Sequence, residues 1–238
     1  MKIPTSVLRI SALNILCLAA SAQSAPRFGV GVTASTLGIG IQGAAAITTH
    51  ANLRAGFNIF DYEHGFAKDG VGYKGDFNLR SVQLTYDHFF GAFHISPGVL
   101  VYNGNSGSAV ASVPGGQPFT LGGTTFYSSS NDPVNGTGRL SVNKAAPMIL
   151  IGFGNLVPRS SRHFGINAEA GVVFQGSPNV KLNLGGTTCL TSSQTACVNT
   201  AANPVVQASL VSEQSKLTND LSALRYYPVV SIGFSYKF

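Results

Sequence analysis

Six polar side chains interrupt segments of this chain that are otherwise built from apolar and small residues. They are Arg54, Gln83, Asp87, His94, Asn167 and Glu169. Around each of them, apolar residues recur at every second position, which is the period of a β-strand. The six side chains therefore lie on the strand faces opposite the apolar ones.

If the apolar faces meet lipid, the polar faces must point into a closed barrel, because a lipid-facing arginine at the bilayer centre costs roughly 2–4 kcal/mol. Arg54, Asp87 and Glu169 can then serve in two ways. They can form a plug of paired charges, since an unpaired buried charge is costly. Alternatively, they can line a narrow polar route for solutes. The residue pattern leaves both interpretations open.

The best candidates for catalysis are Asp61, Glu63 and His64, which cluster at the end of one predicted strand. A lipid-modifying barrel enzyme needs a Ser–His–acid set or paired carboxylates. No sequence motif identifies a nucleophile beside these residues. They are therefore better interpreted as the solvated end of a loop. The five histidines show no metal-ligand spacing, and the glycines of 38–43 lack the crossover helix of a dinucleotide site. We expect no catalytic residue, no metal and no cofactor.

The first residues have the pattern of a secretory signal peptide. Lys2 and Arg9 precede an apolar core at 10–20, and Ala20-Ser21-Ala22 offers a small-x-small cleavage site. We therefore predict a signal peptide at 1–22 and one domain at 23–238. Cleavage after Ala25 is the alternative.

Two cysteines, Cys189 and Cys197, lie eight positions apart in the exported part of the chain. An even pair in an oxidising compartment favours a disulfide that closes a small loop. Two free thiols are the other interpretation.

The composition favours a membrane barrel or a secreted all-β protein. Only 10% of the 238 residues are charged, against roughly 25% in soluble domains, and 28 residues are glycine. After the first 25 residues, no apolar run approaches the ~20 residues of a membrane helix. Removing Lys2 and Arg9 lowers the formal net charge from +6 to +4. That charge is too small and too dispersed to indicate nucleic-acid binding.

Period-two alternation predicts about eight strands, joined alternately by short turns and long loops. The strands are 28–32, 37–47, 52–62, 73–88, 93–102, 140–155, 164–175 and 226–238. The predicted turns are 48–51, 89–92 and 157–163, and the predicted loops are 63–72, 103–138 and 185–224. An even strand number with this alternation is typical of outer-membrane barrels.

One helix is expected inside the last long loop. Asn203 can cap it, and Pro204 suits its first position. The predicted apolar face consists of Val206, Leu210, Leu217, Leu221 and Leu224. The expected fold class is an all-β transmembrane antiparallel up-and-down β-barrel with this short helix.

The final strand, Tyr226 to Phe238, is apolar on one face and small or polar on the other. An edge of that kind would aggregate in water unless a closed barrel paired it. The stretch also resembles the C-terminal signal of Gram-negative outer-membrane proteins. By that resemblance, Tyr236 and Phe238 would form the signal that the barrel assembly machinery reads.

The order of features resembles small eight-stranded outer-membrane proteins of the OmpA and OmpW type, and is most similar to the CarO-type small porins. The resembling segments are 37–62, 76–103, 164–184 and the helix leading into 226–238. The resemblance implies a monomer in the cell outer membrane, in contact with outer-membrane lipids. It also implies passive uptake of small, often basic, solutes. The last residue here is Phe rather than Trp.

The leading functional hypothesis is a narrow channel for passive uptake of small solutes, gated by the loops 103–138 and 185–224. The alternative is a closed barrel that acts as an envelope-structural or surface-interaction protein. A lipid-modifying enzyme is the third and weakest hypothesis.

Overall fold

The computed structural model describes residues 27–68 and 71–238. The predicted signal peptide, including its cleavage site, lies outside these residues and stays a prediction. In the described part, strands dominate and one α-helix is present.

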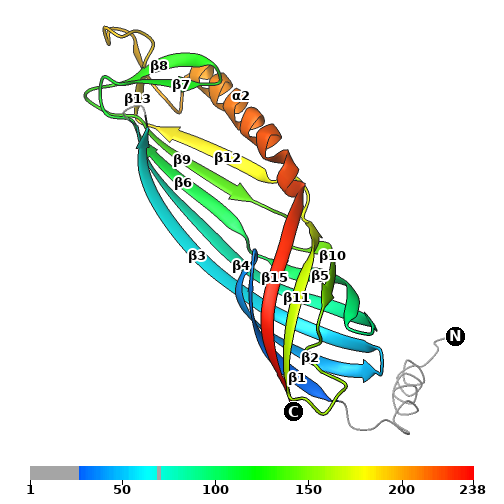
Figure 1. The fold of residues 1–238 in the computed structure, drawn as a ribbon. Helices are drawn as coiled ribbons and strands as arrows, with labels where there is room; N and C mark the ends of the chain where they lie inside the picture. Colours follow the sequence, from blue (N-terminus) through cyan, green and yellow to red (C-terminus); the bar gives the residue numbers. More distant parts are fainter. Residues whose placement is uncertain (1–26, 69–70) are drawn as a thin grey trace, which may run out of the picture.

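Eight strands close into a ring in which every neighbouring pair is antiparallel (Figure 1). The strand β15 closes the ring because it pairs with β1 on one side and with β11 on the other. The remaining neighbours follow in the order β1-β2-β3-β4-β5-β10-β11. The eight strands are β1 (Phe28–Ser35), β2 (Gly38–Thr48), β3 (Ala51–Lys68), β4 (Val71–Phe90), β5 (Phe93–Asn103), β10 (Ala146–Phe153), β11 (Phe164–Phe174) and β15 (Tyr226–Lys237). The predicted up-and-down barrel is confirmed.

Alternation decides which side chains face outward. Ile41 and Phe234 lie on the outside of the wall, where 65% and 60% of their surface is exposed. Arg54, on the inward face of β3, is 1% exposed. The barrel is therefore apolar outside and largely polar inside, which is the reverse of a water-soluble domain and fits a wall surrounded by lipid.

The two ends of the barrel differ. At one end, which we call the turn end, the strands are joined by tight turns at 49–50 and 91–92 and by the segment 154–163. At the other end, β3 and β4 continue far beyond the β1–β2 hairpin, which turns back at 36–37 (Figure 1).

Beyond the ring, the upper part of β4 continues into a second sheet formed by β6 (Ser106–Ser112), β9 (Asn135–Ser141) and β12 (Asn179–Gly185). A small separate sheet consists of β7 (Pro118–Leu121), β8 (Thr124–Ser128), β13 (Thr187–Cys189) and β14 (Cys197–Asn199). We call all of this, together with the tall ends of β3 and β4, the extension. Figure 1 shows the small sheet at its far end and the helix, which runs from there beside β12 toward β15.

The prediction that 63–72 and 103–138 are loops was wrong, because both segments are largely strands of the extension. Gly- and Ser-rich stretches such as 106–112 lack an apolar alternation, so their pairing partners, and not their own side chains, define them as strands. The predicted strand 140–155 is also divided, since β9 ends at Ser141 and β10 begins at Ala146. Residues 179–185 form the separate strand β12, which pairs with β9.

The predicted helix is α2 (Pro204–Asp220), and a 3₁₀ turn, η1 (Leu221–Arg225), follows it. The Asn203 side chain accepts hydrogen bonds from the backbone N–H groups of Val205 and Val206, as a capping residue does. Of the predicted apolar face, Val206 and Leu210 are buried, whereas the leucines further along are half-buried. Among the described residues, no helix is both long and apolar enough to cross a bilayer.

Candidate functional site

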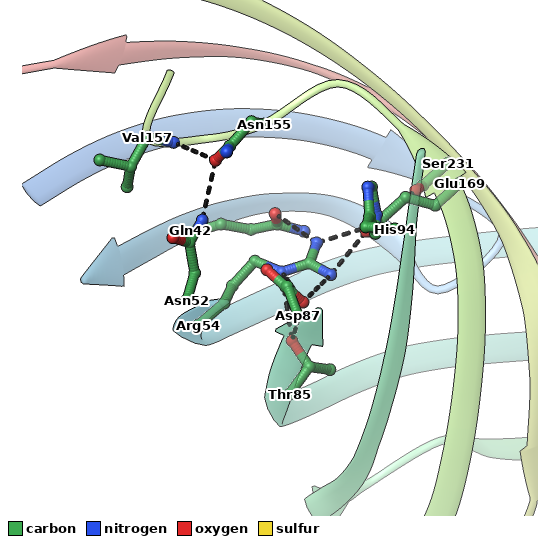
Figure 2. Close-up of polar contacts among 10 residues, drawn as sticks. All are labelled: Gln42, Asn52, Arg54, Thr85, Asp87, His94, Asn155, Val157, Glu169 and Ser231. Atoms are coloured by element: carbon green, nitrogen blue, oxygen red, sulfur yellow. Dashed lines mark hydrogen bonds and ion pairs between the residues drawn. The ribbon is translucent and has the colours of Figure 1, made fainter. Parts of the chain in front are cut away.

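The centre of the barrel holds one guanidinium between two carboxylates (Figure 2). Arg54 donates to Glu169 through two parallel hydrogen bonds, Nη1 to Oε2 at 2.8 Å and Nη2 to Oε1 at 2.5 Å. Its Nη2 also donates to Asp87 Oδ1 at 2.9 Å. All three side chains are almost fully buried. A bidentate guanidinium–carboxylate pair fixes both groups in orientation as well as in distance.

Neutral side chains complete this network around Arg54. The Gln42 amide oxygen accepts from Nη1 at 3.1 Å, and Nε lies 3.2 Å from Thr85 Oγ1. His94 Nε2 lies 2.9 Å from Glu169 Oε1, and Ser231 Oγ donates to Glu169 Oε2 at 3.3 Å. These residues come from β2, β4, β5 and β15, so the network ties distant parts of the wall together.

A glycine makes room for the carboxylate–imidazole contact. Gly152 lies opposite both His94 and Glu169 in the register of β10. A Cβ atom there would lie 2.8 Å from Glu169 Cγ and 3.0 Å from His94 Cε1. Any larger residue at 152 would push these two side chains aside.

Between this network and the extension, the lumen is filled by apolar side chains. They form one buried cluster consisting of Leu37, Leu100, Ala146, Met148, Leu150, Val173 and Val229. Tyr227, two residues before Val229 on β15, packs against this cluster. The cluster gives no hydrogen bonds to water or to polar solutes, and the inward residues Asn58 and Ser81 of β3 and β4 are buried as well, so side chains fill the lumen at this level.

The segment 154–163 closes the turn end of the lumen. Leu156 and Val157 are buried there against Ala44. Arg159 Nη2 donates to the Thr48 carbonyl and to Asn52 Oδ1, both at 2.8 Å. The segment therefore packs into the mouth of the barrel as a stopper.

Lys237 holds the same segment from the opposite wall. Its ammonium group donates to the carbonyls of Pro158 at 3.0 Å and Ser160 at 2.5 Å. Inside the barrel, a small cavity of about 10 Å³ lies beside Glu169 and Ser231. That is the space of about one water molecule. The lumen is thus closed at three levels.

The predicted lumen residues all point into the barrel, but they do not all join one network. Arg54, Asp87, His94 and Glu169 come together. Gln83 borders the small cavity, and the Nδ2 atom of Asn167 is buried without a described hydrogen-bond partner. Three further members of the network, Gln42, Thr85 and Ser231, were not predicted. Their places on the inward strand face are the signal that could have found them.

The candidates for catalysis do not converge. Asp61 and Glu63 lie on the outer face of β3, where they pair with Arg80 at 3.4 Å and Lys74 at 2.7 Å. His64 lies on the opposite face and stacks between Tyr62 and Phe66. The alternation of the strand separates the imidazole from both carboxylates.

These residues also mark where the wall leaves the lipid. Along the outer face of β3, the apolar series ends at Ile59 and is followed by Asp61 and Glu63. Along the inner face, the polar series ends at Asn58 and is followed by aromatic residues from Phe60 onward. The strand keeps its register while its surroundings change from lipid outside to water outside.

The remaining predicted residues lie at opposite ends of the molecule. Cys189 and Cys197 form a disulfide that joins β13 to β14 in the extension. Tyr236 lies on the outer wall at the turn end, where its ring contacts those of His163, Phe164 and Phe238. The structure therefore places these four rings in one aromatic cluster at the membrane edge.

Together, the fold and the filled lumen define a class of protein: a small membrane-spanning β-barrel whose interior is occupied by its own side chains. Solved structures share this architecture, and two of them are described here. The crystal structure of CarO from Acinetobacter baumannii matches with a TM-score of 0.54 and 21% identity, over 88% of this chain and 97% of that one.

The crystal structure of CarO2 from the same organism matches with a TM-score of 0.57 and 20% identity, over 91% of this chain and 100% of that one. No family model matches the sequence, and no curated protein does. At this identity the likeness is one of fold. The CarO-type architecture expected from the sequence is confirmed at that level.

Proposed function

We propose that this chain is an outer-membrane protein whose barrel is a sealed anchor and whose extension acts at the cell surface. The observation that carries the proposal is the closure of the lumen at three successive levels. These are the apolar cluster around Leu150, the ion network of Arg54 and the stopper of 154–163. A barrel filled in this way supports the structural or surface-interaction hypothesis over the uptake hypothesis.

A narrow channel for small solutes is the second candidate. It is favoured by polar atoms that are buried in the lumen without a described partner, among them His94 Nδ1, Ser96 Oγ and Ser235 Oγ. Such atoms can hold water when the lumen widens. Conduction would require both the stopper and the apolar cluster to move.

Reconstitution into planar bilayers and liposomes tests these alternatives. A sealed anchor gives no step conductance and no liposome swelling with small neutral or basic solutes, whereas an open porin in parallel liposomes gives both. Solute-dependent conductance that changes in Arg54→Ala would overturn the sealed-anchor proposal in favour of the channel.

The surface role is tested in cells that lack the protein. We expect a defect in adhesion or envelope integrity that the lumen variant Gln83→Ala restores as well as the unaltered chain does. A chain in which the extension is shortened between β5 and β10 should not restore it. An equal rescue by both would place the function in the barrel. Overexpression should leave the lipid mass spectrum unchanged, and altered lipids would support an enzyme.

A further inference from the structure

The inner face of the extension carries an exposed row of aromatic rings. On β3 it runs through Phe60, Tyr62, His64 and Phe66, with ring centroids 6.1 Å apart between Tyr62 and His64 and 6.2 Å apart between His64 and Phe66. Half of the surface of Tyr62 and of Phe66 is exposed. Contiguous apolar surface outside the membrane is uncommon unless something binds to it.

This row leads into an apolar pocket. The Phe66 ring stacks on Tyr73 with centroids 5.1 Å apart, and Tyr73 lines a cavity of about 560 Å³. The floor of the cavity comes from β6, β9 and β12, where Ala109 and Gly136 leave it open. Its volume lies in the range of small-molecule sites, about 300–1,000 Å³.

The roof of the pocket consists of β7 and α2, which contribute Phe119 and Glu213. Two hydrogen bonds fix this roof in place. The Gly122 N–H donates to Glu213 Oε2 at 3.1 Å, and the Leu182 N–H of the floor donates to Gln214 Oε1 at 3.0 Å. The cavity is therefore formed by elements that are tied together, and not by a loose loop.

The row begins at the membrane boundary. Ile59 is the last lipid-facing residue of β3, and Phe60 follows it on the inner face. The pairing of β2 with β3 also ends at Ile59, so beyond this point the described residues leave the other edge of β3 unpaired. The row thus begins next to the last lipid-facing residue but on the opposite face of β3, and the unpaired edge of the strand joins the two faces there.

The chemistry of the lining restricts the ligand. Glu213 is the charged residue among those that line the cavity, and no lysine, arginine or histidine is among them. A carboxylate accepts hydrogen bonds and repels anions. A long apolar surface that ends beside a carboxylate suits an aliphatic chain whose polar end donates a hydrogen bond.

We propose that this pocket binds a single-chain aliphatic molecule with a hydrogen-bond-donating end group, taken up from the outer boundary of the membrane. The aromatic row guides the chain, the pocket encloses it, and Glu213 accepts the donor. The proposal concerns the extension and is independent of whether the barrel conducts.

The chain contains no tryptophan, so one introduced indole reports on one place. In nanodiscs, the Phe119→Trp variant should show fluorescence quenching by 12-bromododecan-1-ol that saturates. The matched control is Val110→Trp, because Val110 is 47% exposed on the opposite face of β6 and pairs with Lys74. Its quenching should be weak and should rise linearly with the alcohol. Tyr73→Trp serves as a second reporter if Phe119→Trp does not fold.

Two further experiments test whether the probe binds in this cavity and which end group it prefers. Ala109→Phe, combined with the reporter, should abolish the saturable quenching because its side chain fills the cavity. The corresponding bromododecanoate should bind about tenfold more weakly than the alcohol, and Glu213→Gln should remove that difference.

Saturable quenching that survives Ala109→Phe, or equal quenching at positions 119 and 110, would overturn the proposal. Different gel mobilities of boiled and unboiled samples show that each variant is folded. Conductance of the same purified protein in planar bilayers tests the sealed-anchor proposal separately.

Discussion

Burying a cation between two carboxylates carries a large desolvation penalty. The ion network offsets this penalty only when every hydrogen-bond partner is in place. Arg54 is expensive to remove from water, but its five donors all point toward acceptors within the lumen. The network therefore stabilises the barrel only as long as every member is present.

Replacing Arg54 with alanine is predicted to destabilise the barrel by about 3–5 kcal/mol, because Asp87 and Glu169 then lie buried without their partner. Urea unfolding of the protein in lipid vesicles, followed by gel mobility, measures the change. Lys74→Ala is the control, since its ion pair with Glu63 is exposed to solvent. If both variants unfold at the same urea concentration as the unaltered chain, the network is not a stabilising element.

Glu63 lies above the membrane boundary, where a hydrogen bond from Lys74 lowers the pKa of its carboxyl group. A lowered pKa means that the pair stabilises the fold above the unfolded-state pKa and ceases to do so as the pH falls through the folded-state value. We expect an NMR titration to give a midpoint for Glu63 below the ordinary value, and Lys74→Ala to raise it. An unchanged midpoint in that variant would contradict the pairing.

At the residue scale, strand alternation was sufficient to place the lumen residues on the inward face. It could not identify their partners, because the register between distant strands decides which side chains meet. Glu169 reaches Arg54 across 115 positions of sequence, and no local pattern encodes that contact. Gln42 was not predicted because it lies among glycines, so the alternation of polar and apolar residues around it is weak.

The elements that matter most are β3 and β4, which belong both to the barrel and to the extension. In both strands, the polar and apolar faces exchange places at the membrane boundary. The β3–β4 register stays regular there, whereas the β4–β5 register shifts between Val82 and Gln83. The sequence prediction ended the strand at Tyr62 because the charged residues after it looked like a loop. The alternation continued through Tyr62, His64 and Phe66, but with the opposite polarity.

This boundary can be tested with arginine on the outer wall. Ile232 lies in the middle of β15 among lipid-facing residues, so Ile232→Arg should destabilise the barrel by about 2–4 kcal/mol. Ala67→Arg lies on the same outer face of the wall, but on the extension beyond the boundary, and should have little effect. Equal losses in urea unfolding would show that the boundary lies elsewhere.

Across the whole molecule, one continuous sheet combines a membrane-spanning ring with a water-exposed layer. The number of ring strands and the positions of the short turns could be predicted because lipid imposes a strict alternation on every spanning strand. The extension could not, because its strands are short and rich in glycine and serine. These strands pair with strands that lie far away in the sequence.

Closure of the ring depends on close contact between backbones at the seam around β15. A Cβ atom at Gly233 would lie 2.8 Å from Asn167 Oδ1 and 2.9 Å from the Val32 carbonyl. Gly233→Val should therefore lower the fraction of protein that migrates as the folded form on unboiled gels. The neighbouring Ile232→Val faces lipid and should behave like the unaltered chain. Normal assembly of the glycine variant would argue against a tightly packed seam.

The pairing of β15 has a consequence for biosynthesis. The ribosome makes this strand after every other strand of the ring, yet it joins β1, which pairs with residues 231–237, to β11, which pairs with residues 226–236. A nascent chain that stops before Tyr226 exposes two unsatisfied edges at once, whereas a finished chain exposes neither. Loss of this single strand therefore opens the ring on both sides at once, whereas loss of a hairpin at the extension would leave the ring closed.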